Sequence, residues 1–504
     1  MTAVATRSVS VQVDGRAVGE AARLVSVRVT AKLNQPTQCE LAYATRPGPA
    51  GIAGLGAALR VGLTGAADPL FSGEVTAIEY ETEPDGVTTV RVRGYDPLHR
   101  LRKHQELRVF ESVTAAELAG QLAGPVGLSI DAEADGPRLD RVLQHRHSDL
   151  ELLIEVCGRA GLHLAVDGDK LRLVTLDGRG SPVPLDVGRN LWQVRVCANL
   201  DRAAGSSAAL GWHPQRAEVL SGSVDDARSG RDVRQQLDGS VVGAGGTRTL
   251  VDQPGRSEDE VTALAQAAYD ARVASALTVD GTAEGDGALK VGGRIRVGGV
   301  DEQVAGVYVL TEVTHTIDAA SHLTAFSTQP PPAPTPAAGA SVTLGNVTDV
   351  DDPDRTGRVR VKLPALGDLD AGWLAVVCPG AGQGRGIVAL PDVDDTVLVL
   401  LPHGEPTAGL VLGSLFGTIE PPDSAGIDSG RVKRWSLTTA EGQSIVVDNG
   451  GKKLRLANDV GSFLELTPDR LTLHAATDLV LESPGHQMTI RAANIDFQHA
   501  PGSG

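Results

Sequence analysis

The C-terminal part of the sequence repeats a very short pattern, in which two apolar residues flank one intervening residue. Successive apolar pairs begin 7 to 10 residues apart, and turn-forming residues such as Asn449-Gly450-Gly451 and Pro468-Asp469 stand between them. This triplet is typical of a short strand with one buried face. We predict a stack of short strands joined by tight turns, in preference to an ordinary antiparallel meander with one wet face. The pairs are Ile445/Val447, Leu454/Leu456, Leu464/Leu466, Leu471/Leu473, Leu479/Leu481, Met488/Ile490 and Ile495/Phe497.

The spacing of the pairs limits how this apolar face can be covered. A single-chain β-solenoid needs coils of about twenty residues to enclose its own core, and the steps in this chain are shorter. Such steps can supply one side of a triangular prism, so that three copies would bury their apolar pairs on a shared axis. Leaving that column in water would cost about 25 cal/mol per Å². The sequence therefore predicts a homotrimeric needle with these pairs on its axis, which Leu473→Asp should disrupt.

The composition argues against several classes of function. A formal charge of −17 over 504 residues, without basic patches, disfavours nucleic-acid binding because phosphate backbones are negatively charged. The N-terminus has no apolar core of signal-peptide length, and no run of eighteen apolar residues occurs. We therefore expect synthesis and assembly in the cytoplasm, with any later exit by another route. Four cysteines lie far apart without a CxxC pair, which favours reduced core cysteines over a disulfide scaffold or a zinc site: Cys39, Cys157, Cys197 and Cys378.

Proline-rich segments divide the chain. We expect an extended linker at residues 329–340, QPPPAPTPAAGA, and a shorter one at residues 418–432. Residues 1–328 hold strand-like runs and three helix starts with capping boxes, at Thr114, Ser148 and Ser257. Residues 341–417 fit a small closed OB-type barrel, and residues 433–504 form the needle, so the predicted fold is mainly β. The five strand candidates of the barrel are GRVRVKLP, GWLAVVCP, GRGIVALP, DTVLVLLP and TAGLVLGSLFG.

The barrel region resembles the OB-fold segment of VgrG and gp5-like spike proteins. It has an Asp-rich turn before a Gly-Arg-Val strand, a Trp-bearing strand, a Gly-rich loop, and a proline before an acidic turn and a Val-rich strand. The matching residues are Gly357, Arg358, Val359, Trp373, Gly382, Gly384, Pro391 and Gly413. Residues 1–328, notably SDLELLIEVCGRAGLHLAVDGDKLRLV, resemble the gp27-like (late control D) hub. The C-terminal repeat resembles the triple-stranded β-prism, or β-helix, needle of the same family.

The resemblance implies a homotrimeric structural spike in the baseplate of a contractile, phage-tail-like injection system. The hub would attach to inner-tube initiator, tube and baseplate proteins, and the needle would carry a PAAR-type tip protein. Sheath contraction would drive the spike through the target envelope. The segment VKLPALGDLDAG departs from type VI secretion VgrG proteins, which favours the spike of an extracellular particle. Residues 418–432 are too few to hold the lysozyme domain of T4-type spikes.

No stretch of the sequence predicts catalytic residues, a metal or a cofactor. The glycines of PGAGQGRGI and VVGAGGTR do not match a phosphate loop or a dinucleotide fingerprint. The acidic turn at 349–354 lacks the glycine and the distal glutamate of a calcium loop. GxSxG and HExxH motifs are missing. The histidines with ligand-like spacing or a place near the C-terminus have no adequate set of partners in sequence: His145, His147, His474, His486 and His499.

Two other functions stay open. A trimeric tailspike-like glycan depolymerase would need a groove lined with aromatic residues and carboxylates, and aromatic residues are few after Ser341. A type VI secretion VgrG is the other alternative. We expect a non-enzymatic protein that binds no nucleic acid and contacts the target membrane only mechanically.

Overall fold

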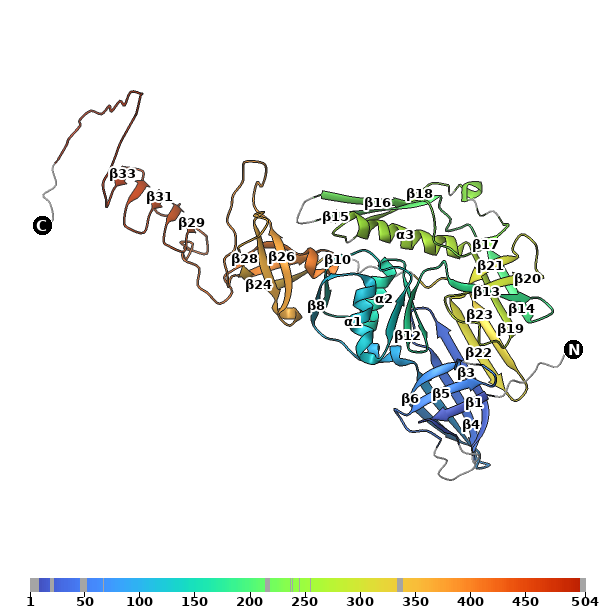
Figure 1. Cartoon of the computed structure of the whole chain (residues 1–504). Helices are drawn as coiled ribbons and strands as arrows, with labels where there is room; N and C mark the ends of the chain where they lie inside the picture. The colour runs from blue at the N-terminus through green and yellow to red at the C-terminus, as the bar shows by residue number, and fades with distance from the viewer. Residues whose placement is uncertain are drawn as a thin grey trace. The chain divides into compact units, whose positions relative to one another are not determined.

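The computed structural model contains two units, residues Met1–Leu415 and Phe416–Gly504. It describes residues 9–18, 22–45, 52–66, 68–213, 218–235, 237, 239–243, 245–253, 255–332 and 339–498. As predicted, the protein is mainly β with few helices (Figure 1). No helix within these described ranges is long and apolar enough to cross a membrane.

An eleven-stranded sheet joins the first and the last strands of the hub region. Its order is β14-β19-β23-β22-β3-β4-β7-β6-β5-β1-β2. Buried and more exposed residues alternate along its strands, as in Ala58–Leu63, and this alternation places Leu41, Val61 and Val92 in the core. The strands are β1 (Val9–Val13), β2 (Arg16–Ala17), β3 (Arg23–Lys32), β4 (Gln38–Thr45), β5 (Ala58–Leu63), β6 (Phe71–Thr82), β7 (Thr88–Tyr95), β14 (Leu191–Ala198), β19 (Leu277–Glu284), β22 (Glu312–Asp318) and β23 (His322–Ser327).

Two capped helices pack over the next part of the hub. Helices α1 (Ala115–Ala123) and α2 (Asp149–Arg159) both begin with the predicted capping box, in which the Ser or Thr hydroxyl and the Glu carboxylate each accept a backbone N–H. Their apolar faces share a core with the adjacent strands. Those strands are β8 (Arg108–Val113) with β10 (Leu139–Gln144), and β9 (Ser129–Ala132), β11 (His163–Asp167) and β12 (Lys170–Val174).

The third predicted helix covers a small sheet. Helix α3 (Glu258–Ser275) packs on β15 (Ser206–His213) and β16 (Glu218–Val224), and β18 (Thr247–Gln253) completes that sheet. Ser257 caps the helix as predicted, but the Glu260 carboxylate accepts the N–H of Arg256, at 3.4 Å, so the reciprocal bond to Ser257 is missing. A further sheet of the hub consists of β13 (Arg179–Asp186), β20 (Gly293–Gly298), β21 (Gly306–Val309) and β17 (Asp232–Val233).

Five strands close into the predicted barrel, in the order β24-β25-β26-β28-β27. The prediction of a strand over GRGIVALP is wrong, because residues 377–395 form a loop that contains Gly384 at φ 68° and Gly386 at φ 147°. The fifth strand is instead β24, which precedes the other four in sequence. The bounds are β24 (Ser341–Asp349), β25 (Arg358–Leu363), β26 (Leu369–Val376), β27 (Thr396–Leu401) and β28 (Leu410–Leu415).

The C-terminal unit contains one five-stranded sheet, in which each strand pairs antiparallel with the next. The strands are short and joined by turns, as predicted, and within a single chain they form the antiparallel meander that was the alternative. The last three predicted pairs, from Leu479 onward, lie outside any strand. The strands are β29 (Arg434–Thr438), β30 (Ser444–Asp448), β31 (Lys453–Ala457), β32 (Phe463–Leu466) and β33 (Leu471–His474).

Candidate functional site

The C-terminal sheet gathers its apolar side chains on one face. Ile445 pairs directly with Leu456, Leu456 with Leu464, and Leu464 with Leu473. A second row runs beside it. Directly opposite residues of an antiparallel pair point to the same side, so each row stays on one side of the sheet. Residues two positions apart in a strand also point to the same side, so both rows share one face. The second row consists of Val447, Leu454, Leu466 and Leu471.

Nothing in the described part of the C-terminal unit covers this apolar face. Leu456 is 40% exposed, Leu473 is 53% exposed and Leu471 is 64% exposed. A sheet normally turns its apolar face toward a core and its polar face toward water. This sheet keeps an extensive apolar face in solvent, which is the feature that most strongly indicates an interaction surface.

The opposite face of the sheet is polar and internally paired. Arg455 forms an ion pair with Glu465 at 3.1 Å, and its guanidinium lies 3.9 Å from the centroid of the Phe463 ring. Arg434 bridges Asp423 at 2.9 Å and Asp448 at 3.2 Å. These contacts satisfy the charges of a single chain, so this face has no comparable need for a partner.

Part of the apolar face forms the wall of a groove of about 580 Å³. Leu437, Ile445, Leu456, Leu473 and Leu479 contribute apolar side chains to its wall. Leu479 is therefore the one predicted axis residue beyond the strands that the groove brings near this face. The other predicted residues after it are exposed and outside any strand: Leu481, Met488, Ile490, Ile495 and Phe497. His499 lies outside the described residues.

Sequence reasoning missed the first strand of the face. Trp435 pairs with Val447 and Leu437 pairs with Ile445, so β29 extends both apolar rows by one residue each. Trp435 is 80% exposed. The signal was present, because RWSLT has the same alternation as the later pairs, and the turn at 439–443 separates it from β30.

The barrel motif residues serve the fold of the barrel. Val359 is fully buried in its core and Pro391 is buried, while Trp373 is half-buried on β26. Gly357, at φ 78°, lies in the turn before β25, and Gly413, at φ 157°, lies within β28, both conformations that favour glycine. Gly382 and Gly384 lie at the tip of the exposed 377–395 loop, where Gly382 and Arg385 exchange backbone hydrogen bonds.

The acidic turn before β25 is a structural element built around Asp352. This buried carboxylate accepts hydrogen bonds from the Arg358 guanidinium at 2.6 and 3.1 Å and from the Thr356 N–H at 2.8 Å. Burial alone would raise the pKa of Asp352, but the hydrogen bonds from Arg358 and Thr356 outweigh it and hold the pKa well below its usual value. A guanidinium thus occupies the position that a cation would need.

Hub and barrel meet through an arginine of the hub. Arg141 on β10 donates to the backbone carbonyl of Asp370 on β26 at 2.8 Å and pairs with Glu111 at 2.8 Å. Arg360 of the barrel binds the Asp370 carboxylate at 2.6 Å. A side chain on Gly367 would collide with Leu107 of the hub, at 2.1 Å. The β25–β26 side of the barrel is therefore already engaged by the hub.

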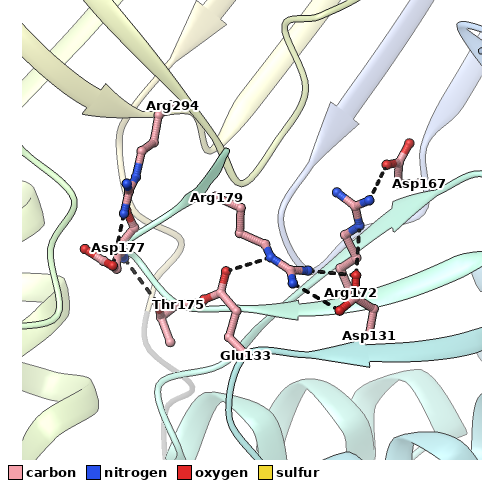
Figure 2. Close-up of polar contacts among 8 residues, drawn as sticks. All are labelled: Asp131, Glu133, Asp167, Arg172, Thr175, Asp177, Arg179 and Arg294. Atoms are coloured by element: carbon pink, nitrogen blue, oxygen red, sulfur yellow. Dashed lines mark hydrogen bonds and ion pairs between the residues drawn. The ribbon is translucent and has the colours of Figure 1, made fainter. Parts of the chain in front are cut away.

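A network of ion pairs ties two sheets of the hub together (Figure 2). Arg179 of β13 forms two hydrogen bonds with Asp131 of β9, at 2.9 and 3.1 Å, and an ion pair with Glu133 at 3.3 Å. Arg172 of β12 pairs with Asp167 at 2.8 Å. The hydrogen bonds from Arg179 lower the pKa of Asp131. Each carboxylate of this cluster pairs with an arginine, so the cluster ties the two sheets together.

The described residues form no group of three or more His, Cys, Asp or Glu that could hold a metal ion. The rings of His145 and His147 lie 6.2 Å apart, and His147 lies 3.6 Å from Glu155. His474 stacks on Phe463, with ring centroids 5.0 Å apart, and His486 is exposed in a turn. The structure therefore brings none of the candidate histidines of the described chain into a ligand set.

The chain thus combines a mostly β region of several sheets with a closed five-stranded barrel. The chain belongs to the phage tail baseplate hub (GPD) family, whose model matches residues 30–321. Residues 343–416 match a second family model, the type VI secretion system/phage-baseplate injector OB domain. The sequence matches no curated protein. The hub and VgrG-like identification made from the sequence is thus confirmed.

Solved structures with the same fold have very different sequences. The chain is 13% identical to an Escherichia coli type VI secretion component similar to the T4 tail proteins gp27 and gp5, with a TM-score of 0.51, 80% of this chain and 99% of that chain covered. It is 8% identical to a chain of the lidded Francisella PdpA-VgrG complex, with a TM-score of 0.53, 92% of this chain and 79% of that chain covered. At these identities the likeness establishes a shared fold.

Proposed function

We propose that this baseplate hub and VgrG-like protein is a homotrimeric spike of a contractile, phage-tail-like injection system. In this function the spike links the inner tube to the tip and punctures the target envelope when the sheath contracts. One observation carries the proposal. The C-terminal sheet aligns its apolar pairs in register on a face that the chain itself leaves in solvent.

The proposed mechanism is mechanical. Three copies of the apolar face would meet on a common axis, which removes from water the side chains that one chain exposes. Interlocked chains transmit an axial load well, because one chain cannot peel away without disturbing the other two. In this arrangement the polar faces, with Arg455 paired to Glu465, would point toward solvent.

The hub is the proposed attachment point for inner-tube initiator, tube and baseplate proteins, and the C-terminal end is the proposed seat of a PAAR-type tip protein. Membership in the baseplate hub family supports the first assignment. The second follows from the place of the exposed segment at 479–498 after the sheet. We further propose cytoplasmic assembly, followed by action as part of a particle outside the cell.

We propose that the spike has no enzymatic activity. The carboxylates of the hub network and Asp352 are all engaged with arginines, which leaves them unsuited to acid–base work on a sugar. Incubating the purified protein with capsule or cell-wall polysaccharide should release no sugar. Sustained release that follows the protein through purification would contradict this part of the proposal.

The trimer is tested by the mass of the full chain in solution, measured by light scattering during size-exclusion chromatography. We expect a trimer for the wild type. Leu473→Asp should dissociate it, because three carboxylates would meet at one level of the apolar column. Circular dichroism should be unchanged, because Leu473 is 53% exposed in the single chain.

Thr438→Asp is the matched control. Thr438 is exposed on β29 and lies on the polar face, next to the apolar Leu437. This variant introduces the same charge into the same sheet and should remain trimeric. A monomeric wild-type chain, or a Leu473→Asp variant that trimerises as well as Thr438→Asp, would remove the basis of the proposal.

A further inference from the structure

The outer wall of the barrel has two different sides. On β25 and β26 the outward residues include Arg358, Arg360 and Asp370, and this side meets the hub through Arg141. On β24, β27 and β28 one part of the outward surface is aliphatic, next to the polar residues Asn346, Thr348 and Thr396. Leu344 pairs across the strands with Leu398, Val342 with Leu400, and Leu400 with Leu410. We call the set Val342, Leu344, Leu398, Leu400 and Leu410 the apolar wall.

The apolar wall is open to solvent in a single chain. Val342 is 55% exposed and Leu344 is 47% exposed, and the other three side chains are half-buried. Outward positions of a small barrel are usually polar, since the inward positions already supply its core. In this barrel the inward core is complete without the wall, with Val359, Leu374 and Val399 fully buried.

The same barrel carries an exposed aliphatic loop. Residues 379–390, PGAGQGRGIVAL, are all solvent-exposed and contain one charge, Arg385. Ile387 is 59% exposed and Val388 is 84% exposed. The second half of this run belongs to GRGIVALP, which the sequence predicted as a strand. In the structure it has no strand to pair with and projects from the barrel (Figure 1).

Internal hydrogen bonds give the loop a defined shape. The Ile387 N–H donates to the Pro379 carbonyl at 3.2 Å, and Gly382 and Arg385 exchange two backbone hydrogen bonds at the tip. A loop that is already ordered loses less conformational entropy when it binds. The loop thus holds the exposed side chains of Ile387 and Val388 in a defined conformation before it binds a partner.

The loop and the end of the apolar wall carry opposite charges. Arg385 forms no ion pair within the described residues. Asp349 at the end of β24 and Asp351 just after it are acidic, and the turn that holds Asp392 and Asp394 is hydrogen-bonded to Val347 of β24. The barrel therefore offers an apolar strip ending in carboxylates, and the loop offers aliphatic side chains beside a guanidinium.

We propose that the apolar wall of each barrel binds the 379–390 loop of a neighbouring copy of this chain. The loop and the wall of one copy do not cover each other, since both are exposed. A contact between two different surfaces closes into a ring when the copies are related by rotation. Only residues 416–433 separate β28 of the barrel from β29 of the C-terminal sheet, so a trimer of the sheet would hold three barrels close to one another. The inference rests on the proposed trimer and gives it a second contact.

The test places the photo-cross-linking amino acid p-benzoylphenylalanine at Val388 of the full chain. After irradiation, we expect dimer and trimer bands on a denaturing gel. Mass spectrometry should map the partner peptide to residues 341–346, 396–401 or 410–412. Adding Leu344→Asp should abolish most of the interchain product, since it introduces a carboxylate into the apolar wall.

Thr438→Asp is the matched control, because it adds one carboxylate at an exposed position of the C-terminal sheet, outside the barrel. It should leave the cross-link unchanged. A trimer whose cross-links fall elsewhere, or that yields no interchain product, overturns this inference and leaves the proposed function standing. A full chain that is monomeric overturns both.

Discussion

The barrel and the C-terminal sheet are both five-stranded and both built from short strands that alternate apolar and other residues. In the barrel, closure turns the inward row to a shared core, where Val361, Leu374 and Val397 are fully buried. In the C-terminal sheet the first and last strands do not meet, and the equivalent row is exposed. The same local pattern therefore gives a domain with a buried core when the sheet closes, and a sheet with an exposed apolar face when it does not.

The largest expected effect concerns the barrel core. Leu374→Ala should destabilise the barrel by about 3 kcal/mol, since a fully buried leucine leaves a cavity when it is shortened. Hydrogen exchange of peptides covering residues 358–376, followed by mass spectrometry, measures this locally. Unchanged exchange in these peptides would mean that the barrel does not depend on its own core.

The next effect concerns the buried carboxylate of the barrel. Asp352→Asn should cost about 2 kcal/mol, because it weakens the hydrogen bonds with Arg358 and Thr356. The folded-state pKa of Asp352 lies below the unfolded value of about 3.9. Its contribution is therefore fully present above about pH 4 and is lost as the pH falls below that value.

Acid titration of the barrel, monitored by the same peptides, measures that loss. Asp352→Asn should flatten the acid limb of the stability curve. Asp354→Asn is the control, because Asp354 also pairs with Arg358 but its side chain is 67% exposed. If the two variants shift the acid limb equally, the buried hydrogen bonds of Asp352 are not its cause.

A smaller effect is expected for the corresponding arginine of the C-terminal sheet. Arg434→Ala should destabilise the sheet less than Asp352→Asn destabilises the barrel, since the pairs of Arg434 with Asp423 and Asp448 are exposed to solvent. Raising the salt concentration should shrink this cost and leave that of Asp352→Asn almost unchanged. Hydrogen exchange of residues 434–448 at two salt concentrations distinguishes the two cases.

The smallest effect on single-chain stability is expected for Leu456→Ala, below about 0.5 kcal/mol, because Leu456 is already 40% exposed. Its effect on assembly should be larger, because the proposed trimer buries this side chain. Thermal melts of dissociated chain and mass measurements over a dilution series separate the two quantities. A large change in the melt of the dissociated chain would mean that the sheet covers its apolar face without a partner.

Local signals in the sequence predicted the local parts of the fold. Thr114 and Ser148 begin α1 and α2 as their capping boxes indicate, and the register of Leu456, Leu464 and Leu473 follows from their alternation. Long-range pairing was not accessible. The contact of β3 with β22 joins Thr30 to Thr314, and no property of either strand alone specifies the other.

The errors have a common physical origin. GRGIVALP has the aliphatic content of a strand, but glycines at positive φ and the absence of a neighbouring strand leave it as a loop. Strand β24 was overlooked because Gly345 interrupts its apolar alternation, although in the structure that glycine lets Val361 and Val399 approach closely. Strand propensity is a property of single residues, whereas a strand also requires a neighbouring strand with which to form hydrogen bonds.

Each strand of the C-terminal sheet pairs only with the strands next to it in sequence. Two consecutive strands therefore form a unit that can be duplicated or lost without changing the direction of the strands that follow, or the side of the sheet on which their apolar residues lie. Loss of a single strand would reverse every strand that follows it. The length of this end of the protein can thus change in evolution through short in-frame insertions and deletions of paired strands, with no change to the barrel or the hub.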